Sequence, residues 1–243
     1  MRIQSDFAGL SLLRLASMAR AGDEVLEALR VLGKAGTNPV AQVLAHQGKF
    51  FEMHHYPKGD VYDAETAAQY YYHAHRPEAG EHGHFHTFIR AKGILADTKP
   101  AAFRGKGKRP RGKNAICHLI AISMNRAGLP IGLFTTNQWV TGESFYGAQD
   151  TIRLLDRFAI DHVQPCLATN RWISAMLRLF RPQIEALLKE RDRSLARWQR
   201  AHPNRAVFDD EDLEVTSSTT IDIDRQIARI ARARAFRSAL HSG

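Results

Sequence analysis

The strongest constraint on the fold is a group of histidines that alternate with other residues on both sides of a turn signal. Seven of the chain's twelve histidines lie between residues 54 and 86. Residues two apart on a strand point to the same face. That spacing joins five of the histidines in two sets: His73 and His75, then His82, His84 and His86. Between the sets, residues 76–80 (RPEAG) have turn chemistry. The pattern predicts a β-hairpin with a histidine-lined face.

The register of this hairpin decides whether the two histidine sets meet. A pairing centred between Glu78 and Ala79 opposes three pairs: His73 with His84, His75 with His82, and Tyr71 with His86. Directly opposed Cβ atoms lie ~5 Å apart, a separation at which two imidazoles can bind one cation. A slip of one residue would turn the two sets to opposite faces of the sheet.

Five imidazoles on one face are unfavourable unless they have partners. Near neutral pH some would protonate and repel one another, and burial without partners would leave ring nitrogens unsatisfied. A divalent transition metal, Zn or Fe, resolves both problems because neutral imidazole is a good ligand for it. We therefore predict four metal ligands: His73, His75, His82 and His84. The alternative is a hydrogen-bonded network of histidines and tyrosines around residues 70–72.

Five residues near the cluster are candidates for catalytic or supporting roles. Glu81 or His86 would lie near the open coordination position and act as catalytic residues. Asp60 and Asp63 would either orient the histidines or cap turns through their own backbone. Glu143 is either a ligand or general base, or the solvated end of a strand formed by 130–140.

Periodicity outside the hairpin indicates an α+β fold in a single domain, 1–243. Residues 1–46 are helical, with a break at Gly22-Asp23, and residues 147–240 are mainly helical. Residues 47–143 form an antiparallel sheet of about four or five strands, at 50–56, 69–76, 81–90, 116–125 and 130–140. Residues 215–223 also have a strand pattern. The stripe of Trp172, Met176 and Leu179 is core.

Several segments together resemble an uncharacterised bacterial domain-of-unknown-function family. They are HHYPKGDVYD (54–63), QYYYHAHR (69–76), EHGHFHTF (81–88), LFTTNQWVTGE (133–143) and the helix of residues 170–192. The resemblance covers about residues 20–235. It implies that the histidine region, Trp139 and the 170–192 helix belong to one domain, and it implies no particular reaction.

The net charge of +9 is concentrated in two segments. Segment 99–113 carries seven Lys or Arg residues and segment 225–237 carries five Arg residues, and neither contains an acid. Such segments favour phosphates. They predict, as an alternative function, a nucleic-acid-binding protein or a metal-independent nuclease. Because Phe103 is the only aromatic residue of 99–113 available to stack on bases, we expect such binding to be weak.

The remaining features bound the function class. No run approaches the ~20 apolar residues of a membrane span, and Arg14 and Arg20 interrupt the apolar N-terminal stretch, so we expect a cytoplasmic protein without membrane partners. Cys117 and Cys166 are too few for a disulfide framework. The first hypothesis is a metal-dependent enzyme, a hydrolase or a non-haem oxygenase acting on a small molecule. The third, after the nucleic-acid alternative, is a non-catalytic metal storage or sensing protein. The sequence leaves the substrate and the oligomeric state open.

Overall fold

The computed structural model describes residues 7, 9–75, 80–102, 107 and 109–241. Its helices are α1 (Leu12–Lys34), α2 (Pro39–Leu44), α3 (Gln138–Thr141), α4 (Ala148–Leu154), α5 (Leu167–Leu179), α6 (Arg181–Ala201) and α7 (Ile223–His241). Its strands are β1 (Tyr56–Tyr62), β2 (Ala68–His73), β3 (Gly83–Arg90), β4 (Ile116–Met124), β5 (Pro130–Thr136) and β6 (Val215–Thr220).

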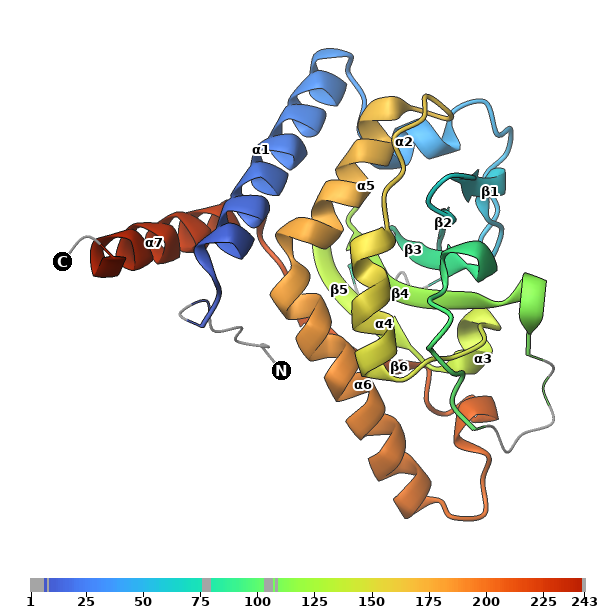
Figure 1. Ribbon diagram of the computed structural model, residues 1–243. Coiled ribbons are helices and arrows are strands. Elements are labelled where there is room, and N and C mark those ends of the chain that lie inside the picture. The colour runs from blue at the N-terminus through green and yellow to red at the C-terminus, as the bar shows by residue number, and fades with distance from the viewer. Residues whose placement is uncertain (1–6, 8, 76–79, 103–106, 108, 242–243) are drawn as a thin grey trace.

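The strands form one antiparallel sheet in the order β1-β2-β3-β4-β5-β6. This sheet, with helices before and after it in the chain, confirms the predicted α+β class (Figure 1). The sheet has six strands rather than four or five. The difference is β6, which lies within the mainly helical segment 147–240 and pairs with β5, where Phe134 is opposite Ser218.

Two predicted strands have other positions. The first is predicted at 50–56, but β1 spans Tyr56–Tyr62. An irregularity in its pairing with β2, between Tyr56 and Val61, accommodates the turn-like residues there. The segment after β5 leaves the sheet as the short helix α3. The Asn137 side chain accepts a hydrogen bond from the Gln138 backbone N–H at its start, and Gly142, with φ of +61°, ends it.

The predicted break at Gly22-Asp23 is wrong, since α1 continues through both residues. Glycine at position 22 serves packing instead of termination. A Cβ atom on Gly22 would lie 3.0 Å from the Cγ1 atom of Ile227 on α7. The absence of a side chain therefore lets α7 approach α1 closely, at the cost of a weaker helix former inside α1.

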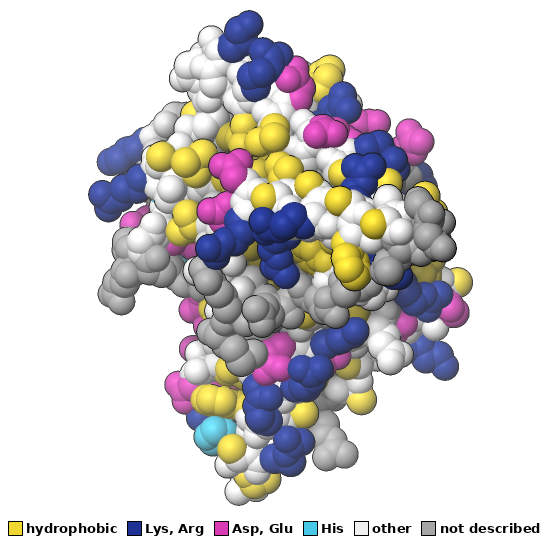
Figure 2. Space-filling view, turned by 90° about the vertical axis from the view of Figure 1, so that its left-hand side faces the viewer, with side chains coloured by type: hydrophobic (Ala, Val, Ile, Leu, Met, Phe, Trp, Pro, Cys, Tyr) yellow, Lys and Arg dark blue, Asp and Glu magenta, His cyan; other side chains and the backbone are white. Residues whose placement is uncertain are grey.

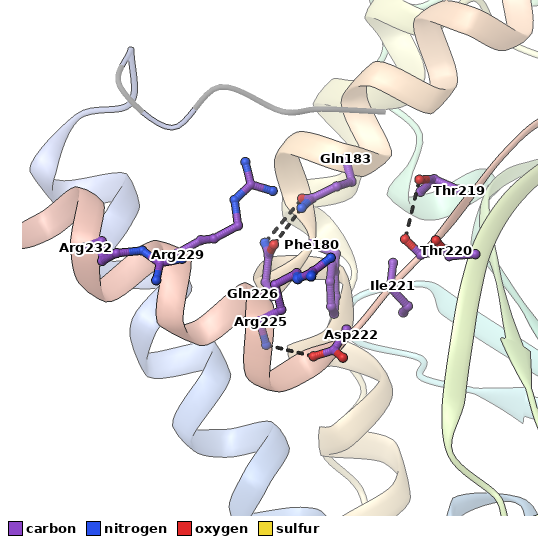
Figure 3. Close-up of a pocket in the computed structure, with 10 residues that line it drawn as sticks. All are labelled: Phe180, Gln183, Thr219, Thr220, Ile221, Asp222, Arg225, Gln226, Arg229 and Arg232. Carbon is purple, nitrogen blue, oxygen red and sulfur yellow. Dashed lines mark hydrogen bonds between the residues drawn. The ribbon is translucent and has the colours of Figure 1, made fainter. Parts of the chain in front are cut away.

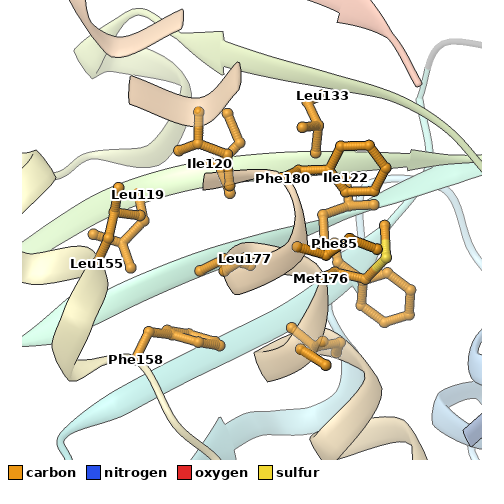
Figure 4. Close-up of a cluster of buried hydrophobic side chains, with 14 of the residues drawn as sticks. Phe85, Leu119, Ile120, Ile122, Leu133, Leu155, Phe158, Met176, Leu177 and Phe180 are labelled. Atoms are coloured by element: carbon orange, nitrogen blue, oxygen red, sulfur yellow. The ribbon is translucent and has the colours of Figure 1, made fainter. Parts of the chain in front are cut away.

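The hydrophobic core lies between the sheet and a layer of helices formed by α4, α5 and α6 (Figure 1). Figure 4 shows strand residues such as Phe85 and Ile122 facing Met176 and Phe180 on the helical side. Helix α1 packs outside this layer, against α5 and α7. In the described part of the chain, no helix is both long enough and apolar enough to span a bilayer.

Candidate metal centre

The hairpin register is the one that the sequence predicts. In the β2–β3 ladder, His73 is opposite His84 and Tyr71 is opposite His86. The turn at 76–79 lies outside the described residues. Because alternate residues share a face, these four side chains lie on the sheet face opposite to Tyr72 and Phe85, which belong to the core.

Three imidazoles converge on this histidine face. His73, His75 and His84 each offer one ring nitrogen, and the three nitrogens all lie within 4.8 Å of one another. The Nε2 atoms of His73 and His84 are 2.7 Å apart. The ring of His75 lies 5.0 Å from that of His73 and 5.2 Å from that of His84, measured between centroids. The structure thus brings together three of the four predicted ligands.

Two of the three converging histidines are buried, and His75 is partly exposed. His84 is 0% and His73 6% exposed. Loop residues approach from this side: the His55 ring stacks on Tyr71 with centroids 3.5 Å apart, and Glu214 lies 3.9 Å from His75. Burial excludes the competing water that would otherwise solvate a cation, so any ion bound here depends on these side chains.

Glu81 lies behind His84. Its Oε1 atom is 2.5 Å from Nδ1 of His84, and both side chains are buried. A carboxylate in this position accepts a hydrogen bond from the Nδ1–H of the ring and leaves the Nε2 lone pair facing the cluster. Carboxylates commonly hold metal-binding histidines in this way. The structure therefore places Glu81 as a residue that orients His84.

The donor set fits a transition metal. Three neutral imidazoles with a supporting carboxylate suit zinc, which binds nitrogen at about 2.0–2.1 Å. Two nitrogens on a tetrahedral ion of that size are about 3.3 Å apart. The two Nε2 atoms of His73 and His84, now 2.7 Å apart, form an N–H···N hydrogen bond. The distance between the two Nε2 atoms is therefore somewhat shorter than the spacing of two ligands on one such ion.

His82 is separated from the other predicted ligands. Its Nδ1 atom lies 2.5 Å from the hydroxyl of Tyr72, and its ring stacks on Phe50. Tyr72 faces the core, so His82 does not share the face of His84. The physical reason is that β3 begins at Gly83. His82 lies in a bend before the strand, where alternation does not apply.

Gly83 permits this close packing, and its replacement is a direct test. A Cβ atom at this position would lie 2.5 Å from the carbonyl oxygen of His73 and 2.5 Å from the hydroxyl of Tyr72. We expect Gly83→Ala to lower the free energy of unfolding by about 1–3 kcal/mol through overpacking. Urea denaturation checks this. Gly33→Ala is the control, since nothing lies within 4 Å of its Cβ position. Equal stability of the two variants would contradict the assignment.

His86 and His118 form a second pair beside the cluster. Nδ1 of His86 is 3.0 Å from Nε2 of His118, and the His86 ring lies 4.7 Å from that of His84. Burial, with the positive charge of Arg191 nearby, lowers the pKa of His118 to about 3, so this ring is neutral. The sequence places His118 on another strand with a core role. The sequence does not predict the contact between His86 and His118, because a bulge between Thr87 and Phe88 shifts the register of β3 against β4.

Glu143 is buried and is not the end of a strand. It follows α3 and is 0% exposed, and its Oε2 atom accepts a 2.7 Å hydrogen bond from the backbone N–H of His118. The other oxygen, Oε1, has no hydrogen-bond partner among the described residues. Burial raises the pKa of Glu143 to about 7. A carboxyl group of this kind exchanges a proton near neutral pH.

The raised pKa of Glu143 predicts a pH-dependent stability. The folded pKa of about 7 exceeds the ordinary value of 4.5 for a glutamate, so its ionisation opposes folding as the pH rises from about 4.5 through 7. Glutamine cannot ionise and still accepts the bond from His118. Relative to wild type, Glu143→Gln should gain up to about 3 kcal/mol between pH 5 and pH 8. Denaturation at both pH values, with chelator present, measures this. The exposed Glu65→Gln is the control, and a pH-independent difference would refute the expectation.

The outer residues of the site have separate roles. Asp60 lies 3.2 Å from Nδ1 of His55 and accepts a 2.7 Å bond from Gln69, so it orients a histidine. Asp63 accepts hydrogen bonds from the backbone of the following loop, so it caps a turn. Burial and nearby carboxylates raise the pKa of Tyr71, which therefore stays protonated.

The two basic segments can be described in part. In segment 99–113, residues 103–106 and 108 lie outside the described residues. Within the described part, the guanidinium of Arg109 lies 4.6 Å from the ring of Phe208, so one of the seven charges packs against an aromatic ring. Segment 225–237 belongs to α7.

Comparison with known proteins gives one match. A family model described as a domain of unknown function (DUF6969) matches residues 19–221. No curated protein and no solved structure matches the chain.

Proposed function

Because the chain belongs to the DUF6969 family, a family of unknown function, we propose from the site itself that it is a metal-dependent enzyme whose ion is held by His73, His75 and His84. The observation that carries the proposal is the convergence of three ring nitrogens within 4.8 Å of one another. Glu81 behind one of these rings supports it. The family match confirms the resemblance that the sequence suggests.

Three histidine ligands favour catalysis over storage. Structural zinc sites have four protein ligands, whereas catalytic sites have three and keep a position open for water or substrate. When bound in such a site, zinc lowers the pKa of a coordinated water and makes it a nucleophile at neutral pH. Non-haem iron oxygenases use two histidines and a carboxylate. The all-histidine set therefore favours a zinc-dependent hydrolase over an oxygenase.

The chain's own residues would prepare the site for this chemistry. Glu81 holds His84 in the tautomer whose Nε2 lone pair faces His73 and His75. His86, 5.1 Å from the His73 ring between centroids, is placed to accept or donate a proton beside the open position. His118, neutral at physiological pH, bonds His86 and fixes the orientation of its ring.

The positioning role of Glu81 gives a separate prediction. Replacing Glu81 with Gln keeps the shape but removes the charge that favours the Nδ1–H tautomer of His84. Loss of a supporting carboxylate typically costs 10–100-fold in metal affinity, and we expect a loss in that range for Glu81→Gln. Competitive zinc titration with a chromophoric chelator measures it. Glu65→Gln is the matched control. Unchanged affinity in Glu81→Gln would show that Glu81 plays no part in metal binding.

Zinc titration of the apoprotein tests the proposal itself. We expect saturable binding of about one ion per chain, with His73 in the tautomer that carries its proton on Nδ1 and presents the Nε2 lone pair. Hydrolysis of activated esters and phosphoesters by the zinc-loaded protein, abolished by chelator and restored by zinc, would support the enzymatic part. Tight zinc binding without any turnover on such panels would favour the storage or sensing alternative.

A further inference from the structure

A second candidate binding site lies at the other edge of the molecule, away from the histidines. A cavity of about 570 Å³ opens between the end of β6, the start of α6 and the first turns of α7 (Figure 3). Cavities that bind small molecules have volumes of about 300–1,000 Å³. None of the lining residues is a histidine or belongs to β2 or β3. The cavity is therefore separate from the candidate metal centre.

The cavity is strongly positive. Arg225, Arg229 and Arg232 line it, and their spacing of four and three residues places them on one side of α7. Among the described residues of the lining, Asp222 is the only carboxylate. Its Oδ1 atom accepts a 2.8 Å hydrogen bond from the backbone N–H of Arg225, so it caps the helix. In the described part of the chain, no ion pair joins Arg225 or Arg232 to a carboxylate.

The scaffold beneath these arginines is rigid. Gln183 of α6 donates a 2.6 Å hydrogen bond to Gln226 of α7, and Gln226 donates one of 2.8 Å to the carbonyl of Leu179. Both glutamines are buried, so the pair fixes the start of α7 on α6. The guanidinium of Arg229 lies 4.5 Å from the ring centroid of Phe7, which restricts its motion. Binding of a ligand here therefore costs little conformational entropy of the backbone.

We propose that this cavity binds a phosphorylated small molecule, with the guanidinium groups of Arg225 and Arg232 contacting the phosphate oxygens. The planar donors of arginine match phosphate in a bidentate manner and retain their charge at all physiological pH values. Arg225 and Arg232 face a lining whose one described carboxylate, Asp222, already caps the helix, and two such cations favour a multiply charged anion. Figure 2 shows Lys and Arg side chains prevailing over acids on the side of the molecule that α1 and α7 form, which favours approach of such an anion.

The concave shape favours a small molecule over nucleic acid. Proteins that bind single strands follow the backbone along an extended groove with aromatic side chains for the bases. Here the arginines line one cavity, and Phe180, which is 1% exposed, is the only aromatic residue among the described ones that line it. Phe180 is therefore unavailable for stacking on a base.

Calorimetric titration with inorganic pyrophosphate, at low and at physiological salt, tests the proposal on the full chain. We expect Arg225→Gln and Arg232→Gln each to weaken pyrophosphate binding about tenfold, as loss of a charge-assisted hydrogen bond predicts. The matched control is Arg234→Gln, an exposed arginine on the same helix that does not line the cavity. It should change the affinity less than twofold. Circular dichroism and urea denaturation establish that each variant is folded.

Three results would overturn the proposal. The first is absence of pyrophosphate binding to wild type at millimolar concentration in low salt. The second is an equal loss in Arg234→Gln, which would indicate a general effect of net charge. The third is tight binding of a single-stranded oligonucleotide that pyrophosphate does not displace, which would assign the arginines to a nucleic-acid surface. None of these results depends on the metal centre, so the two proposals fail separately.

Discussion

Replacing His84 with alanine is expected to abolish metal binding and to remove the stabilisation that the metal gives. A metal that binds only the folded state adds RT ln(1 + [L]/Kd), ~2.7 kcal/mol at a hundredfold excess over Kd. Wild type should therefore lose stability when a chelator is added, whereas His84→Ala should not respond. His73→Ala should behave in the same way, because the two Nε2 atoms lie 2.7 Å apart.

The double variant distinguishes shared ligands from separate contributions. Once one ligand is lost the metal is gone, so the His73→Ala/His84→Ala double variant should cost little more than either single variant. Thermal unfolding with and without chelator measures all three variants. His82→Ala and His118→Ala are the controls, because the structure joins these rings to Tyr72 and to His86 rather than to the convergent nitrogens. Retained stoichiometric metal in His84→Ala would refute the assignment.

The largest loss of stability is expected from Trp172→Ala. Trp172 is 0% exposed on α5, and its ring lies 5.8 Å from that of Phe85 on the core face of the sheet. Truncating a buried tryptophan costs about 3–5 kcal/mol. In a chain of this size each kcal/mol lowers the melting temperature by about 2–4 °C, so a fall of about 6–20 °C is expected in calorimetry.

A conservative replacement sharpens that prediction. The indole N–H of Trp172 has no hydrogen-bond partner among the described residues, so Trp172→Phe loses volume but no hydrogen bond. It should cost less than half as much as Trp172→Ala. Both variants should keep their metal below the melting temperature, because Trp172 packs on the face opposite to the histidines. Loss of metal from folded Trp172→Phe would contradict the separation of the two faces.

The sequence predicts the centre of the site well because its two determinants are local. Alternation within β2 and β3 and the short turn together fix the pairing of His73 with His84. The same argument fails at His82, where the strand has not yet begun. Backbone direction at a bend depends on tertiary contacts, here the closeness of Gly83 to Tyr72, and no periodicity carries that information.

The partners outside the hairpin depend on contacts between distant segments. His118 meets His86 only because a bulge shifts the β3–β4 register, and a bulge has no reliable sequence signal. Glu143 reaches the backbone of His118 through a capped helical turn where alternation suggested a strand. In hindsight Asn137 and Gly142 are the recognisable signals of that turn, since they are typical residues at the start and end of a helix.

The number of strands was underestimated for a similar reason. Residues 215–223 have a strand pattern, but nothing local indicates that they pair with residues 130–136 across about eighty intervening residues. The sequence predicts a helix break at Gly22, but the glycine instead lets Ile227 of α7 pack closely against α1. Local patterns therefore predicted the type of each element more reliably than its partners in space.

The most direct test of the account is the metal content of the untagged protein, purified without a nickel column and measured by inductively coupled plasma mass spectrometry. We expect about one zinc or other first-row transition metal per chain after reconstitution. This metal should be retained in His82→Ala and absent from His84→Ala. Substoichiometric metal in the reconstituted wild type would contradict it, and would leave His73, His75 and His84 as a hydrogen-bonded histidine network.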